Sequence, residues 1–352
     1  MSDNTFKINT IPSLTWNHLN MNEAEIEAVK VCPGLSELNE QIPESIELSE
    51  AEPSYASDIR GGTGEVFDSM LKSNLDKCRV LTCKEGAAAE EPVVISVNCK
   101  DGSAEGKKYV LEAEANSKVT IVTDFSSDDG AKGRSCFQTL IRIGKGAEVT
   151  LVQTNRLSRD FELINDVGAV LEEGAKLNIV HIFLGGSNIY QGCNIVLKGD
   201  QAVVKKDIGY FLKDGQELDM NYVVIHEGKK TECDIKASGV LEGESSKLFR
   251  GTIDFKNGCA GSKGAEIEEV ILRDDTAHNK TIPVILCAEE DVEGSHGATI
   301  GRIDEDLIFY MQTRGFEEEE VYRLISRSKL LSFCDKILDE EIRNKTMTFL
   351  SE

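Results

Sequence analysis

The chain has 352 residues, 40% of them hydrophobic, which is enough to bury a sizeable core in one large domain or in two to three smaller ones. Its 62 acidic and 39 basic residues give a formal charge of −23. This charge repels nucleic-acid phosphates and anionic lipid head groups, so proteins or cations are the expected partners. The opening residues lack the features of a secretory signal, and no apolar run is long enough to span a membrane. We therefore expect a cytoplasmic protein that binds neither nucleic acid nor membrane.

Residues 1–90 are predicted to form a small, partly irregular N-terminal cap that contains some helix. The stretch "MNEAEIEAVK" (21–30) is compatible with a helix, whereas proline and acidic residues dominate the segment that follows it.

Residues 91–300 have a different character, with short runs of alternating apolar and polar residues separated by Gly, Asn or Asp and no long helix between them. A pattern recurs as "NSKVTIV" (116–122), "GAEVTLV" (146–152) and "GAKLNIV" (174–180), at spacings of 30 and 28 residues. Each copy begins with Gly or Asn, which adopt left-handed backbone angles at low cost. A weaker copy, "GQELDMN", follows at residue 215.

Strand-plus-turn repeats of this length predict a mainly β fold in which stacked coils form a parallel β-helix, or β-solenoid. We prefer this fold to a β-sandwich because a sandwich gives no reason for the same turn residue to recur in the same phase. The alternative, a chance resemblance among strands that end in glycine, stays open at this point.

Residues 301–352 are predicted to form a C-terminal helical region. Asp304 is placed to cap a first helix, and Gly315 supplies its left-handed stop. A second helix is expected to begin in "EEEE", where acidic residues favour the positive end of the helix dipole. This second helix is expected to carry apolar residues at roughly helical intervals, namely Val321, Leu324, Ile325, Leu331 and Ile337. We expect a helical pair that packs on the solenoid or on another protein.

Motifs for common catalytic chemistry are missing from the sequence. No G-x-x-x-x-G-K-[ST] phosphate loop and no G-x-S-x-G elbow occurs, which argues against an ATPase or a hydrolase triad. A polysaccharide-active β-helix enzyme is a rival hypothesis, but only 6% of residues are aromatic and Trp16 is the sole tryptophan.

Ten cysteines are spread along the chain without a C-x-x-C motif, and most are expected to be reduced and buried. Among the histidines, His181 and His226 lie in strand-like runs and are expected to be structural, while His278 is expected in an exposed loop. His296 lies in "EGSHGAT", which we interpret as a turn. Flanking glycines leave its imidazole approachable, so it is a candidate ligand for iron or zinc, with a turn-stabilising hydrogen bond as the alternative.

Cys287 precedes His296 by nine residues. If the intervening segment forms a corner, thiolate and imidazole would make a donor set suited to iron–sulfur chemistry. A core cysteine at the end of an apolar strand is the alternative.

The segment "VILCAEEDVEGSHGATIGRIDEDLIFYMQTRGF" (284–316) resembles the C-terminal signature of the SufB/SufD family of iron–sulfur cluster assembly proteins. The stretches "FRGTIDFKNGCAGSKG" (249–264) and "KTIPVIL" (280–286) are similar to family segments upstream of it. The resemblance implies a right-handed parallel β-helix. It also implies a non-catalytic scaffold or accessory subunit that works with a SufC-type ATPase and a SufB-type scaffold.

Particular residues gain roles from this resemblance. His296 would lie at the interface with the partner scaffold, where a transient cluster or iron is handled, and no tightly bound cofactor is expected. The family's ATPase-docking region maps onto Leu307, Phe309, Tyr310, Arg314, Gly315 and Phe316.

Two departures from the SufB pattern favour a SufD-like chain. The stretch "DDTAHNKTIP" (274–283) has no cysteine, and Gly297 stands where SufB has glutamate. A reduced two-component system, in which the chain pairs with itself as the sole scaffold, is the alternative, and Cys287 would then be a more attractive ligand.

Overall fold

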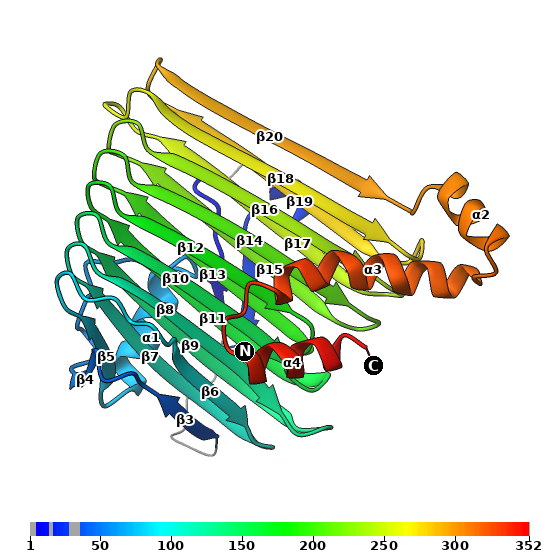
Figure 1. Cartoon of the computed structure of the whole chain (residues 1–352), viewed down its shortest axis with the longest axis horizontal. Helices are drawn as coiled ribbons and strands as arrows, with labels where there is room; N and C mark the ends of the chain where they lie inside the picture. Colours follow the sequence, from blue (N-terminus) through cyan, green and yellow to red (C-terminus); the bar gives the residue numbers. More distant parts are fainter. Residues whose placement is uncertain (1–4, 14–16, 28–35, 352) are drawn as a thin grey trace.

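The computed structural model describes residues 5–13, 17–27 and 36–351, and its main body is a two-sheet parallel β-solenoid (Figure 1). Each coil adds one strand to each of two sheets, which have nine strands apiece in the described part of the chain. In spatial order, the first sheet contains β20 (Val292–Gly301), β18 (Ser262–Leu272), β16 (Glu232–Leu241), β14 (Val203–Leu212), β12 (Lys176–Phe183), β10 (Glu148–Arg156), β8 (Lys118–Ser127), β6 (Val93–Cys99) and β3 (Glu37–Gln41). The second contains β19 (His278–Cys287), β17 (Ser246–Phe255), β15 (Glu217–His226), β13 (Asn188–Leu197), β11 (Asp160–Leu171), β9 (Lys132–Ile143), β7 (Ser103–Ala113), β5 (Cys78–Cys83) and β4 (Ile46–Ala51). The β-solenoid prediction is confirmed.

The three strong sequence repeats lie directly beside one another in the first sheet. Their strands, β8, β10 and β12, pair in parallel so that Val119, Val149 and Leu177 share one level. Asn116, Gly146 and Gly174 precede them with φ of 55°, 67° and 65°, so the same left-handed turn starts each strand. The weaker copy at residue 215 belongs to β15 of the second sheet instead. Gly215 has φ of 75°, and Leu218 and Met220 are buried as in the other copies, so the same turn starts strands of both sheets.

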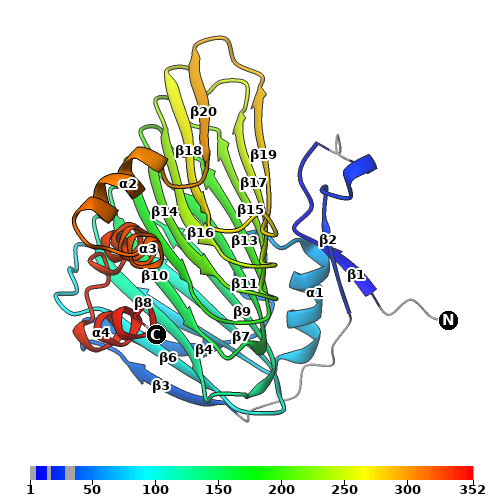
Figure 2. The same ribbon diagram turned by 90° about the vertical axis from the view of Figure 1, so that its right-hand side faces the viewer.

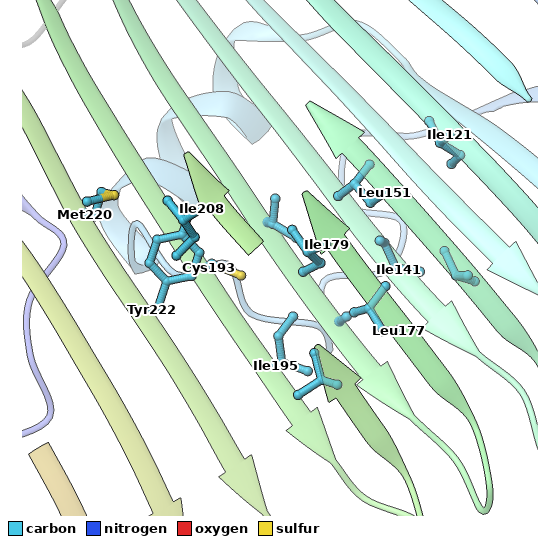
Figure 3. Packing of buried hydrophobic residues seen from close by; sticks show 14 of the residues in the cluster. Ile121, Ile141, Leu151, Leu177, Ile179, Cys193, Ile195, Ile208, Met220 and Tyr222 are labelled. Carbon is cyan, nitrogen blue, oxygen red and sulfur yellow. The ribbon is translucent and has the colours of Figure 1, made fainter. Parts of the chain in front are cut away.

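Apolar side chains from both sheets fill the space between them (Figure 3). Ile121, Leu151 and Ile179 are stacked along the first sheet and are at most 2% exposed. Ile195 and Tyr222 contribute from the second sheet and are fully buried. Each such side chain contributes about 1.5–3 kcal/mol relative to an exposed position, so coil stacking dominates the stability of the fold.

The N-terminal residues cover the outer face of the second sheet (Figure 2). They form β1 (Thr5–Ile8), a 3-10 turn at Asn17–Leu19, β2 (Ala24–Glu27) and α1 (Glu65–Asn74). The helix expected at 21–30 is wrong where the structure describes it, because β2 pairs antiparallel with β1. Residues 28–30 lie outside the described part. Ile26 packs with Ile8, Phe67 and Leu71, and this apolar contact outweighs the helix propensity of the acidic residues around it.

The chain closes with three helices, α2 (Glu305–Thr313), α3 (Glu318–Cys334) and α4 (Glu340–Phe349), on the side of the first sheet (Figure 2). Asp304 caps α2 as predicted, accepting a hydrogen bond from the Asp306 amide at 2.7 Å, and Gly315 has φ of 92°. The prediction of a pair of helices was wrong, because a third helix, α4, begins after Asp339. The Asp339 side chain caps α4 by accepting a hydrogen bond from the Ile342 amide.

Helix α3 lies across the outer face of the first sheet (Figure 1). Tyr322 packs with Val240 and Ile271, and Leu330 and Phe333 join a second apolar cluster. No helix in the described ranges is long and apolar enough to cross a membrane.

Candidate interface site at the end of the solenoid

The two ends of the solenoid are built differently. At one end the sheets finish in β3 and β4, which pair antiparallel with their neighbours. At the other end β19 and β20 are the outermost strands, and within the described residues no further strand pairs with either (Figure 1). An outermost strand presents unpaired backbone groups that can pair with another chain.

His296 lies on β20, in the middle of this bare edge. Its interpretation as a turn residue was wrong, because the glycine-rich segment is extended and pairs in parallel with β18, where Glu266 is the partner of His296. A Cβ on Gly294 would lie 3.2 Å from side-chain carbons of Ile285 and Phe255, so Gly294 faces the space between the sheets. Two residues on, His296 faces the same way. Its side chain is exposed because no further coil covers it.

Cys287 is the last residue of β19 and is exposed. Its thiol donates a hydrogen bond to the Glu289 carbonyl oxygen at 3.1 Å. Gly294 on β20 faces Ile285 on β19 across the interior, which places His296 at the same level as Pro283. Pro283 lies four strand positions from Cys287. Four positions span roughly 13 Å along a strand. His296 and Cys287 therefore both lie at the bare end, but within one chain they are too far apart to bind the same metal ion. Among the described residues, no group of three His, Cys, Asp or Glu side chains is placed to hold a metal ion.

Directly beneath His296, the interior of the solenoid is charged rather than apolar. Glu268 is 1% exposed and accepts hydrogen bonds from Lys247, from the Thr281 hydroxyl at 2.6 Å and from the Tyr210 hydroxyl at 3.2 Å. Lys247 is fully buried, and burial lowers the pKa of its ammonium although Glu268 opposes this shift. The sequence pattern did not single out either residue for function, yet together they put a buried ion pair one coil below the bare end.

Glu266 is the second interior carboxylate of this cluster. Burial, assisted by the nearby charge of Glu268, raises the pKa of Glu266 to about 7. Room for its side chain comes from Gly251 on the opposite sheet, where a Cβ would lie 1.9 Å from the Glu266 Oε2 atom. A carboxyl group with this pKa exchanges protons near neutral pH, next to the strand that carries His296.

A signal for these carboxylates was present in the alternation of "GAEIEEVIL" (264–272). Val270 faces the core, and Glu266 and Glu268 lie on the same face of the strand because they are four and two residues before it. Ile267 lies on the opposite face and is 46% exposed. Sequence reasoning missed the site because apolar residues are normally assigned to the buried face of a strand, and here two charges occupy it.

The predicted docking residues form an exposed apolar surface on and after α2, which projects from the solenoid beside the bare end (Figure 1). The exposed fractions are 42% for Leu307, 68% for Phe309, 52% for Tyr310 and 38% for Phe316. Arg314 lies over the Tyr310 ring at 5.1 Å and donates to its hydroxyl at 3.1 Å. None of the residues of α2 is buried. Large apolar side chains clustered in this way are typical of protein contact surfaces.

The other histidines fit simpler roles. His181 and His226 are fully buried as predicted for structural residues; His181 bonds to the Tyr222 hydroxyl and His226 to the Thr231 hydroxyl. Burial lowers the pKa of His181 to about 3 and that of His226 to about 4, so both are neutral at pH 7. His278 is exposed as predicted, but it begins β19 rather than lying in a loop.

None of the nine described cysteines is in a disulfide, and all of them except Cys287 are buried. Cys32 lies outside the described residues. Cys287 is therefore the accessible thiol within the described part of the chain.

The structure thus combines a parallel β-solenoid with one bare end, a histidine on that edge and an exposed apolar helix beside it. A family model described as "SUF system FeS cluster assembly, SufBD core domain" matches residues 96–329, from within β6 into α3. The chain belongs to the SufB/SufD family of the SUF iron–sulfur cluster assembly system, and its relatives make it SufD-like.

Two of these relatives are named SufD. The chain is 23% identical over 265 residues to the iron–sulfur cluster assembly protein SufD of Bacillus subtilis, covering 74% of this chain and 60% of the relative. It is 20% identical over 298 residues to SufD of Escherichia coli, covering 82% and 69% respectively. A chloroplastic SufBD family protein of Arabidopsis thaliana, ABCI8, is 25% identical over 206 residues, or 56% of this chain and 37% of the relative. The chain thus spans only part of the length of these proteins.

Proposed function

We propose that this chain is a non-catalytic scaffold or accessory subunit of the SUF machinery, working with a SufC-type ATPase and a SufB-type scaffold in the cytoplasm. The observation that carries the proposal is the presentation of His296 on the outermost strand of a bare solenoid end. Strand β20, together with β19, offers backbone groups along which a second solenoid can dock. Docking there would bring the partner's side chains to the His296 imidazole.

In this proposal His296 supplies one ligand to a nascent iron–sulfur cluster, which is the cargo of the assembly, and the partner supplies the others. A neutral imidazole is a suitable ligand for iron. The buried Glu266 beneath it has a pKa of about 7, so it can take up or release a proton as charge builds up at the interface. No tightly held resident cofactor is needed for this role.

The ATPase would bind the apolar surface formed by Leu307, Phe309, Tyr310 and Phe316. Two features support this assignment: α2 contributes no buried residue to this chain, and its aromatic side chains are the type enriched at the centres of protein interfaces. Since α3 follows α2 and packs on the first sheet, a force applied to α2 would reach the solenoid through α3.

The test is anaerobic co-expression with a SufC-type ATPase and a SufB-type scaffold, followed by measurement of subunit stoichiometry, iron and sulfide. We expect a stable three-component complex that carries iron and sulfide. His296→Ala should leave the complex intact and lower its iron and sulfide content. His278→Ala is the matched control because it removes another exposed histidine from the same end of the solenoid. A lone chain that binds neither partner, or equal cluster content in both variants, would refute the proposal.

The alternative, a homodimer in a two-component system, is favoured by the exposure of Cys287 at the same bare end. Two copies docked through their edges would present two histidines and two thiols. In that case expression with the ATPase alone gives a dimer whose cluster content falls in Cys287→Ser, whereas a SufB-dependent complex keeps its cluster content in that variant.

A further inference from the structure

A pocket of about 260 Å³ lies between α3 and the ends of three strands of the first sheet. Its walls come from α3, from the end of β14, from the residues just after β14, β16 and β18, and from the two residues that follow α4. Phe211, Leu330 and Leu350 provide apolar surface, and the rest of the lining is mainly charged. Nothing in the proposed scaffold role uses this pocket.

The charges around the pocket are unusual for a protein with a net charge of −23. Four cations line it, namely Lys213, Arg273, Arg323 and Arg327, against the two carboxylates of Glu242 and Glu319. Both carboxylates are already paired with Arg273, one of them at 2.6 Å.

The other three cations, Lys213, Arg323 and Arg327, form no ion pair with any carboxylate in the part of the chain that the structure describes. Local charge is therefore positive while the protein as a whole is strongly negative. Such a local excess concentrates small anions at the pocket.

The three unpaired cations are also arranged at some electrostatic cost. Arg323 and Arg327 are four residues apart on α3, so their side chains are neighbours on one helix face and repel each other. Lys213 is only partly exposed, and its ammonium lies 5.3 Å from the centroid of the Phe211 ring. An anion bound between these groups would relieve the repulsion and accept charge-assisted hydrogen bonds from them.

We propose that this pocket binds a small phosphate-type oxyanion, held by Arg323 and Arg327 with Lys213 at its side. Guanidinium groups match the geometry of phosphate oxygens and can bind them in pairs. The volume lies below the roughly 300–1,000 Å³ of pockets for drug-sized ligands, so it suits free phosphate, pyrophosphate or one phosphoryl group better than a whole nucleotide. Anion binding at this pocket is separate from the proposed scaffold function and does not depend on it.

The experiment is isothermal titration calorimetry on the full chain alone, with inorganic phosphate, pyrophosphate and ADP as separate ligands at constant ionic strength. We expect saturable binding that weakens about tenfold or more in the double variant Arg323→Gln/Arg327→Gln, because each substitution removes a charge-assisted contact. Both side chains are exposed, so the fold should be kept, and circular dichroism checks this. The matched control is Arg159→Gln/Lys176→Gln, which removes the same charge from two exposed positions elsewhere.

Binding that is lost in the pocket variant and kept in the control supports the site. If ADP binds more tightly than free phosphate and this binding is lost in the pocket variant, the site is supported and its ligand is the phosphoryl group of a nucleotide. The proposal is overturned by the absence of saturable heat up to millimolar phosphate, by equal loss in the control, or by an equal response to chloride. The scaffold proposal is unaffected by these outcomes because the titration uses neither partner nor cluster.

Discussion

The buried ion pair between Lys247 and Glu268 gives the sharpest test of the solenoid interior. Their side chains are 0% and 1% exposed, so each charge depends on the other for compensation. Glu268→Gln would leave the buried Lys247 ammonium without the carboxylate that is hydrogen-bonded to it, and only the Glu266 carboxyl would remain nearby. Removing one partner of such a pair costs about 3–5 kcal/mol, whereas replacing both by groups of similar size is close to neutral. We therefore expect Glu268→Gln to lower the free energy of unfolding by about 3–5 kcal/mol, and Lys247→Met/Glu268→Gln to recover most of that loss.

Equilibrium urea denaturation followed by circular dichroism measures these differences, and the single variants Glu268→Gln and Lys247→Met with the double variant complete a thermodynamic cycle. The control is Glu173→Gln, which removes an ion pair to Lys145 at 2.8 Å with side chains 66% and 59% exposed. Exposed pairs contribute about 1 kcal/mol or less. If Glu268→Gln is no more destabilising than this control, the charges under the bare end are not tightly coupled.

Three further predictions concern the same region. Gly251→Ala should destabilise the fold by about 1–3 kcal/mol in urea denaturation because its Cβ meets the Glu266 carboxylate, while Gly297→Ala, with no atom within 4 Å of its Cβ, should change little. The pKa of Glu266 is raised in the folded state, so the free energy of unfolding of the wild-type protein should fall as pH rises from about 5 through 7. Glu266→Gln lacks this titration and should not show the fall. The free energy of unfolding of the variant, relative to that of wild type, should therefore increase by about 2–3 kcal/mol between pH 5 and pH 8. A wild-type protein that loses no more stability than the variant over this range would contradict the pKa. Phe309→Ser should leave the thermal midpoint unchanged, since the side chain is 68% exposed, but abolish co-purification with the ATPase; retained binding would remove α2 from the interface.

Local features of the sequence were enough to predict the repeating part of the fold. Asn116, Gly146 and Gly174 adopt left-handed angles, and the alternating residues after them fit a strand with one buried face. The cap of α2 by Asp304 was likewise predictable because it involves an amide two residues away. Signals of this kind depend on backbone preferences within a few residues, which the sequence carries directly.

Features that depend on contacts between distant segments could not be predicted in this way. Residues 24–27 form a strand because Ile26 meets Ile8, Phe67 and Leu71, which local propensity does not encode. The placement of His296 on an edge strand, rather than in a turn, likewise follows from its pairing with β18.

Periodicity and family signature together established that the chain folds into stacked coils ending in capped helices, and they singled out His296 and the aromatic helix. The contacts of the folded chain were needed to show that His296 lies over Glu266 and Glu268, and that Cys287 lies four strand positions away from its level. This difference arises because the alternation of a strand specifies two faces but not which neighbour lies at each level. The neighbour at each level depends on the register between coils about 30 residues apart. Packing across the whole solenoid determines that register.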